Sequence, residues 1–88
     1  MGVFVESIHS TFYRQVIGEL VAARKAAGLT QAEVAKRWGR QQSIVAKIET
    51  CERRIDVVEF VALGTIVGLK PTLVIDEIEK ALKFELGQ

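Results

Sequence analysis

The segment spanning residues 29–49 constrains the fold of this chain more than any other part of it. Its apolar residues recur at helical spacing in two short runs, with Gly39 between them. Glycine supplies the backbone freedom that a tight turn needs, and two helices that cross steeply there leave room only for a small side chain at Ala35. The residues expected to clamp the two helices together are Val34, Val45 and Ile48. The segment therefore predicts two short helices joined by one turn.

Two capping-box patterns predict where helices begin. Thr30 is followed three residues later by Glu33, and Asp56 is followed three residues later by Glu59. In this pattern the cap side chain and the later acid each bond the other residue's backbone N–H. Helices are therefore expected to start after Thr30 and after Asp56, with another between them over about residues 41–50.

Further signals complete the outline of the fold. Ser10 or Thr11 can cap a first helix that ends near Gly28, and Pro71 fits the first turn of a fifth helix. Residues 1–9 are apolar and partly β-branched, which predicts a short arm or strand. The expected fold class is all-α, with five helices in a single domain (10–88) that follows the N-terminal arm (1–9).

Composition and charge narrow the possible roles. The net charge of the 88 residues is only +1, but residues 24–54 carry eight basic and three acidic side chains. Such a local excess is what a phosphate-facing surface requires. The single cysteine, Cys51, forms no intrachain disulfide, and no apolar run approaches membrane-spanning length. A cytoplasmic protein without a secretory signal is expected.

The residues at these spacings resemble the lambda-repressor-like helix-turn-helix family, often called the Xre family. The resemblance covers roughly residues 17–75. The matching positions are Arg24, Gly28, Leu29, Thr30, Gln31, Val34, Ala35, Gly39, Gln42, Ser43, Val45, Ile48 and Glu49, with the apolar helix after Asp56. The resemblance implies a helix-turn-helix over residues 30–50 whose second helix lies in the DNA major groove. It further implies a bacterial or phage transcriptional regulator, most often a repressor.

Side chains of the predicted third helix suit base reading. A glutamine carboxamide can donate to adenine N7 and accept from adenine N6 at once. Lys47 can reach guanine or a phosphate, and the small side chains of Ser43 and Ala46 can contact a thymine methyl or a base edge. The predicted base-reading residues are Gln41, Gln42, Ser43, Ala46 and Lys47.

Flanking side chains are expected to contact phosphates, which fixes the register on DNA without reading sequence. The start of a helix offers free backbone N–H groups to a phosphate oxygen. The predicted phosphate contacts are Thr30, Gln31, Arg40, Thr50, Arg53 and Arg54.

The resemblance also implies two internal contacts. Gln31 is expected to brace Gln42, and Arg24 is expected to form a partly buried ion pair with Glu49. Cys51 departs from the family, which more usually has glycine there, and it would be strained if the turn is left-handed.

Proteins with this motif usually bind two half-sites as dimers, about one turn of DNA apart. A homodimer on double-stranded DNA with an inverted-repeat operator is therefore expected. The candidate interface consists of apolar residues in the arm and in the fifth helix, namely Val3, Phe4, Val5, Leu73, Ile75, Ile78 and Leu82.

One alternative function remains open at this point. An antitoxin-type or protein-interaction module would use the same fold mainly to bind a protein partner. An enzyme is not expected, because the sequence holds one histidine, one cysteine and no nucleophile or phosphate-loop motif. No cofactor or metal site is expected either.

Overall fold

The computed structural model describes the backbone of residues 2–87 and the side chains of residues 9–87. Within these residues the chain forms five α-helices and no strand, which confirms the all-α fold class. The helices are α1 (Gly2–Ala26), α2 (Gln31–Trp38), α3 (Gln42–Glu49), α4 (Val57–Val67) and α5 (Pro71–Glu85). The molecule is elongated, with extents of 42 × 23 × 20 Å.

The expectation of an arm or strand over residues 1–9 is wrong for the described part of that segment. The helix α1 begins at Gly2 and passes through Ser10 and Thr11, so neither residue caps it. A lone strand would leave its backbone groups unpaired, whereas a helix bonds its own backbone. The β-branched residues disfavour a helix by only a few tenths of a kcal/mol each, roughly, so the helix continues through them.

Both predicted capping boxes are present. The Thr30 hydroxyl accepts from the Glu33 backbone N–H at 3.0 Å, and the Glu33 carboxylate accepts from the Thr30 N–H at 2.9 Å. Asp56 and Glu59 make the same reciprocal pair, at 2.7 and 3.0 Å. Between them, α2 ends at Trp38 and is capped by Gly39, whose φ of 76° lies in the left-handed region. Local sequence thus fixes the starts of α2 and α4 and the turn into α3.

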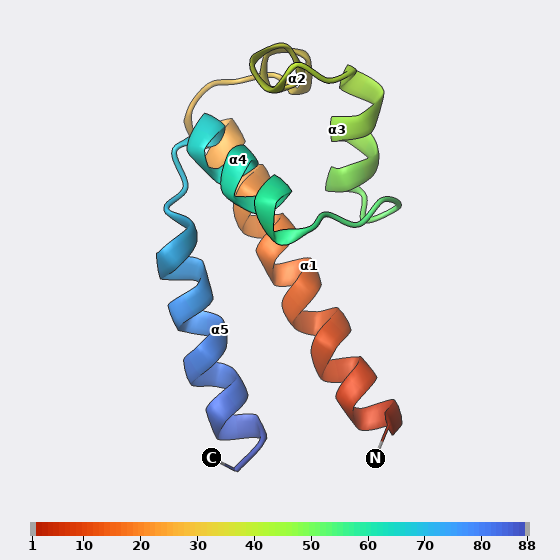
Figure 1. Ribbon diagram of the computed structural model, residues 1–88, viewed down its shortest axis with the longest axis vertical. Coiled ribbons are helices and arrows are strands. Elements are labelled where there is room, and N and C mark those ends of the chain that lie inside the picture. Colours follow the sequence, from red (N-terminus) through yellow and green to blue (C-terminus); the bar gives the residue numbers. More distant parts are fainter. Residues whose placement is uncertain (1, 88) are drawn as a thin grey trace.

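The buried core lies where the five helices meet. Its fully buried hydrophobic residues are Ile17, Leu20, Val34, Ala35, Val45, Ile48, Phe60, Leu63, Val67 and Val74. The N-terminal part of α1 and most of α5 extend beyond this core and diverge from each other (Figure 1). We call residues 17–74 the head and the diverging parts, residues 9–16 and 75–86, the tail.

Candidate nucleic-acid interface

The helices α2 and α3 form a rigid pair in the head. Val34 and Ala35 of α2 are buried against Val45 and Ile48 of α3, all at 3% exposure or less. Ala35 is the small residue that permits this approach, as the sequence predicts. Because one side of α3 is buried, its position relative to the rest of the head is fixed by packing.

The other side of α3 is open to solvent. Gln42, Ser43 and Lys47 are exposed, Gln41 precedes the helix and is also exposed, and Ala46 is half-buried. The predicted base-reading residues therefore lie on the accessible side of one short helix. Had Gln42 and Lys47 been packed inside the protein, no major-groove contact by α3 would be possible.

A chain of polar contacts connects this exposed side to the protein interior. The Arg24 guanidinium donates to both carboxylate oxygens of Glu49, at 2.6 and 2.9 Å. Its third contact, at 2.9 Å, is to the carbonyl oxygen of Leu29. Gln31 Nε2 donates to Glu49 Oε1 at 2.8 Å, and Gln42 Nε2 donates to Gln31 Oε1 at 2.8 Å.

The ion pair between Arg24 and Glu49 is present and partly buried, as the resemblance implies. The two side chains are 12% and 13% exposed. The hydrogen bond to Glu49 raises the pKa of Arg24, which favours the charged guanidinium. The pair joins α1 to α3 on the side of α3 that faces the protein, and so helps to fix the orientation of α3.

Arginines beside α3 are held by contacts within the head. Arg53 Nη2 lies 2.9 Å from Glu59 Oε2, and Arg40 Nη1 lies 3.8 Å from the same oxygen. The Arg40 guanidinium also stacks over Trp38, 4.5 Å from the ring centroid. Hydrogen bonds from Arg53 and from the Asp56 backbone lower the pKa of Glu59, which keeps this carboxylate ionised.

Two residues that were predicted to contact phosphates, Arg54 and Thr50, contact other side chains of the protein in this structure. Arg54 stacks over the Tyr13 ring of α1 at 4.6 Å, and the Tyr13 hydroxyl accepts from the Ile55 N–H at 3.1 Å. The Thr50 hydroxyl lies 2.7 Å from a Glu52 carboxylate oxygen. Thr30 and Gln31 lie together at the start of α2, whereas Arg54 and Thr50 lie in the segment after α3.

The sequence did not indicate the roles of two residues in these contacts, Glu59 and Tyr13. Glu59 was expected only to cap α4, but it also binds Arg53, six residues earlier. Tyr13 is 42 residues from Ile55, and no local pattern indicates that contact. Only a packed tertiary structure brings α1 beneath the segment between α3 and α4.

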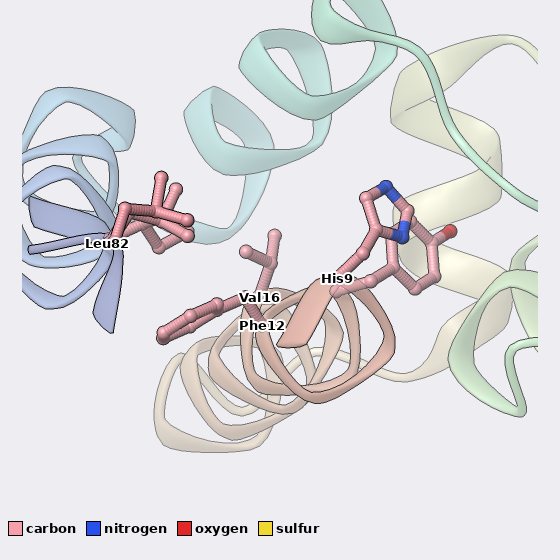
Figure 2. Close-up of a pocket in the computed structure, with 7 residues that line it drawn as sticks. His9, Phe12, Val16 and Leu82 are labelled. Atoms are coloured by element: carbon pink, nitrogen blue, oxygen red, sulfur yellow. The ribbon is translucent and has the colours of Figure 1, made fainter. Parts of the chain in front are cut away.

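Among the described residues proposed for self-association, Ile75, Ile78 and Leu82 lie in the tail, and Leu73 lies at the end of the head. Leu73 and Ile75 are 58% and 49% exposed, and Ile78 and Leu82 are half-buried. The side chains of Val3, Phe4 and Val5 lie outside the described residues. An apolar groove of about 320 Å³ separates α1 from α5 (Figure 2). It is lined by His9, Phe12, Tyr13, Val16, Ile78, Leu82 and Leu86.

Other kinds of site are not formed by the described residues. No three metal-binding side chains cluster among residues 9–87. None of the helices described is both long and apolar enough to cross a membrane.

The fold and the exposed side of α3 are those of a helix-turn-helix domain. Proteins that contain this domain are DNA-binding regulators. A family model described as "Helix-turn-helix domain" matches residues 18–75, more than half of the chain, so the chain belongs to this family. The predicted membership of the Xre family is also confirmed. A solved structure of an XRE-family like protein from Pseudomonas syringae pv. tomato str. DC3000 is 40% identical, with a TM-score of 0.82. The match covers 88% of this chain and 94% of that one. No curated protein matches the chain.

Proposed function

We propose that this protein is a sequence-specific transcriptional repressor that binds an inverted-repeat operator as a homodimer. The observation that carries the proposal is the exposed side of α3, where Gln41, Gln42, Ser43 and Lys47 are all accessible. A helix in the major groove reads sequence through such side chains, and a bound dimer hinders access to a promoter. The protein would then act in the cytoplasm of a bacterial cell.

Phosphate contacts on both sides of α3 would set the register. Thr30 and Gln31 lie at the start of α2, where backbone N–H groups favour an anion. Arg40 and Arg53 share one carboxylate, so their charge is only partly neutralised within the protein. A phosphate can therefore bind either guanidinium without breaking its contact to Glu59.

The tail supports the homodimer. Its groove is almost entirely apolar, and the apolar surface continues along α5 through Ile75 and Leu86, at 49% and 54% exposure. Exposed apolar surface that continues into a groove marks an interaction site. A second copy is the occupant we propose, since each copy contributes both the groove and the exposed residues that fill it, as two-fold symmetry requires.

Selection of bound sites from random double-stranded DNA tests the function. We expect an enriched inverted repeat with half-sites about one helical turn apart. Gln42→Ala should remove the preference at one base pair in each half-site but leave weak, salt-sensitive binding. The matched control is Gln15→Ala, an exposed glutamine on α1.

Two results would contradict this proposal. Equal losses of affinity on operator and random DNA would remove Gln42 from base reading. No enrichment of any sequence by the unmodified protein would favour the alternative, that the domain mainly binds a protein partner.

Sedimentation tests the homodimer separately. We expect a dimer at micromolar concentration and a monomer for Leu82→Asp, which places a charge in the groove. Thr72→Asp, at an exposed position on α5, should remain dimeric. A monomeric mass for the unmodified protein, both free and on DNA, would rule out the dimer.

A further inference from the structure

A small polar cleft lies between α1 and the segment that follows α3. Its volume is about 60 Å³, and it is lined by Ser10, Tyr13 and Arg14 of α1 together with Cys51 and Arg54. Unlike the groove between α1 and α5, its lining is mostly polar. Because two arginines line so small a space, the cleft favours a negatively charged ligand.

Arg54 is held so that its N–H groups face away from the protein core. Its guanidinium stacks 4.6 Å from the centroid of the Tyr13 ring. The ring is itself held in place, because its hydroxyl accepts from the Ile55 N–H at 3.1 Å. Stacking uses the flat face of a guanidinium, whereas the N–H donors point outwards from its edge. The Arg54 donors therefore remain available to a ligand.

Arg14 reaches the same cleft from α1. Side chains four residues apart lie on one face of a helix and lean towards its N-terminus, so Arg14 and Ser10 share a face. Both residues are exposed. They stand beside the segment after α3 because α1 runs as a helix through residues where an arm was expected. A guanidinium and a hydroxyl are both hydrogen-bond donors to an oxyanion.

The positive charge of the cleft is not cancelled by the described acids. The ion pairs formed among residues 9–87 involve neither Arg14 nor Arg54. The acids of the adjoining segment bind other groups, since Glu52 accepts from the Thr50 hydroxyl and Asp56 from a backbone N–H, each at 2.7 Å. Two like charges lining one cleft repel each other, and an anion between them would bind to both.

We propose that this cleft binds a backbone phosphate of DNA, with Arg14 and Ser10 as contacts outside the helix-turn-helix motif. The inference rests on the proposed function, because it assumes that α3 lies in the major groove. The segment after α3 then lies against the phosphates at the edge of that groove. The family match begins at residue 18, so neither Ser10 nor Arg14 belongs to the motif.

The position of α1 suits such a contact. In Figure 1 the N-terminal half of α1 projects below α3 and the segment after it, with α5 on the opposite side. The cleft has room for one phosphate group and excludes a base. The contact would therefore add affinity and salt dependence without reading sequence.

The salt dependence of binding to random double-stranded DNA tests the proposal through Arg14→Met. We expect the slope of log affinity against log salt concentration to become shallower by about one, since one phosphate contact is lost. Affinity at low salt should fall roughly fivefold, and by the same factor on the operator. Arg14→Lys should keep most of the slope, because an ammonium also binds phosphate.

The matched control is Lys80→Met, which removes the same charge from an exposed position on α5. Its slope should stay close to that of the unmodified protein, because Lys80 is far along the chain from the cleft and does not line it. Circular dichroism checks that both variants fold. An equal change of slope in the two variants would show an effect of net charge alone and would overturn the proposal.

Single neutral methylphosphonates in the operator locate the contact. Replacing the phosphate that binds in the cleft should weaken the unmodified protein roughly fivefold but leave Arg14→Met unaffected, since both changes remove the same interaction. Replacements at other contacted phosphates should weaken both proteins equally. If every replacement weakens both proteins equally, Arg14 contacts no phosphate and the inference is wrong.

A free anion is the other source of the same chemistry. Titration calorimetry with inorganic phosphate and DNA-free protein distinguishes it. Phosphate binding that Arg14→Met abolishes, together with unchanged DNA binding by that variant, would assign the cleft to a free anion and overturn the DNA contact. Failure to select any operator would instead overturn the proposed function, and the salt slope on random DNA would still decide this inference.

Discussion

The head and the tail of this molecule are stabilised in different ways. In the head, charged and polar side chains find defined partners, and α2 and α3 are fixed by four buried apolar residues and a partly buried ion pair. In the tail, α1 and α5 are separated by an apolar groove of about 320 Å³ (Figure 2). The head therefore finds its packing partners within one chain, whereas the tail leaves apolar surface uncovered, and there we propose that a second copy binds.

Amide hydrogen exchange should give the largest contrast between the two regions. Amides near Val34 and Val45 should open only with global unfolding, at about 5 kcal/mol or more. Tail amides near Phe12 and Leu82 should open at about 1 kcal/mol in dilute protein and become slower at higher concentration as copies associate. Uniform protection at all concentrations would remove the distinction between head and tail.

Loss of the partly buried ion pair between Arg24 and Glu49 should destabilise the head. Arg24→Met leaves Glu49 unpaired at 13% exposure and should lower the free energy of unfolding by about 3 kcal/mol in urea titration. Lys25→Met, at the exposed neighbouring position, should change it by less than about 0.5 kcal/mol. Similar losses in the two variants would show that the pair contributes little.

The junction between head and tail depends on Gly64 in α4. A Cβ at this position would meet the Leu69 carbonyl oxygen and Pro71 Cγ, each at 3.0 Å. Gly64→Ala should therefore lower stability by about 1 kcal/mol, although alanine favours a helix. A Cβ at Gly18 would meet no atom within 4 Å, so Gly18→Ala should instead raise stability by about 1 kcal/mol. Thermal unfolding of both variants checks the opposite signs.

Acid should weaken the head through Glu59. Its pKa is lowered in the folded state, so its contribution is present above the unfolded value of 4.5 and is lost as pH falls through the folded value. Glu59→Gln should lose about 1 kcal/mol at pH 7 and show a smaller further loss between about pH 5 and pH 3. Glu77→Gln, exposed on α5, should follow the unmodified protein.

The smallest expected effect concerns the turn after α3. Cys51 has a φ of 64°, so it adopts the left-handed conformation that disfavours residues other than glycine. Cys51→Gly should relieve this strain but also remove the contacts of a half-buried side chain. The net effect should be a gain in stability of about 0.5 kcal/mol. Gly39→Ala makes the reverse change at φ 76° and should lower stability by about 1 kcal/mol. A loss with Cys51→Gly would mean that packing of the thiol outweighs the strain.

The sequence contains enough local information to predict most of the head. Capping boxes at Thr30 and Asp56, the turn at Gly39 and the apolar residues of α2 and α3 all depend on neighbours within four positions, so their patterns can be read directly. The pairs Arg24–Glu49 and Gln31–Gln42 were predicted from the family resemblance, because their spacing belongs to the motif. The roles of these residues on DNA stay predictions.

The rest was decided by tertiary structure. The start of α1 at Gly2 was predicted wrongly, because apolar β-branched residues suit a strand only where another strand pairs with them. The contact of Gln31 with Glu49 and that of Tyr13 with Ile55 join distant residues, and no periodicity encodes them. A helix forms through contacts between residues a few positions apart, so its pattern can be read from the sequence. Polar contacts between helices depend instead on how those helices pack.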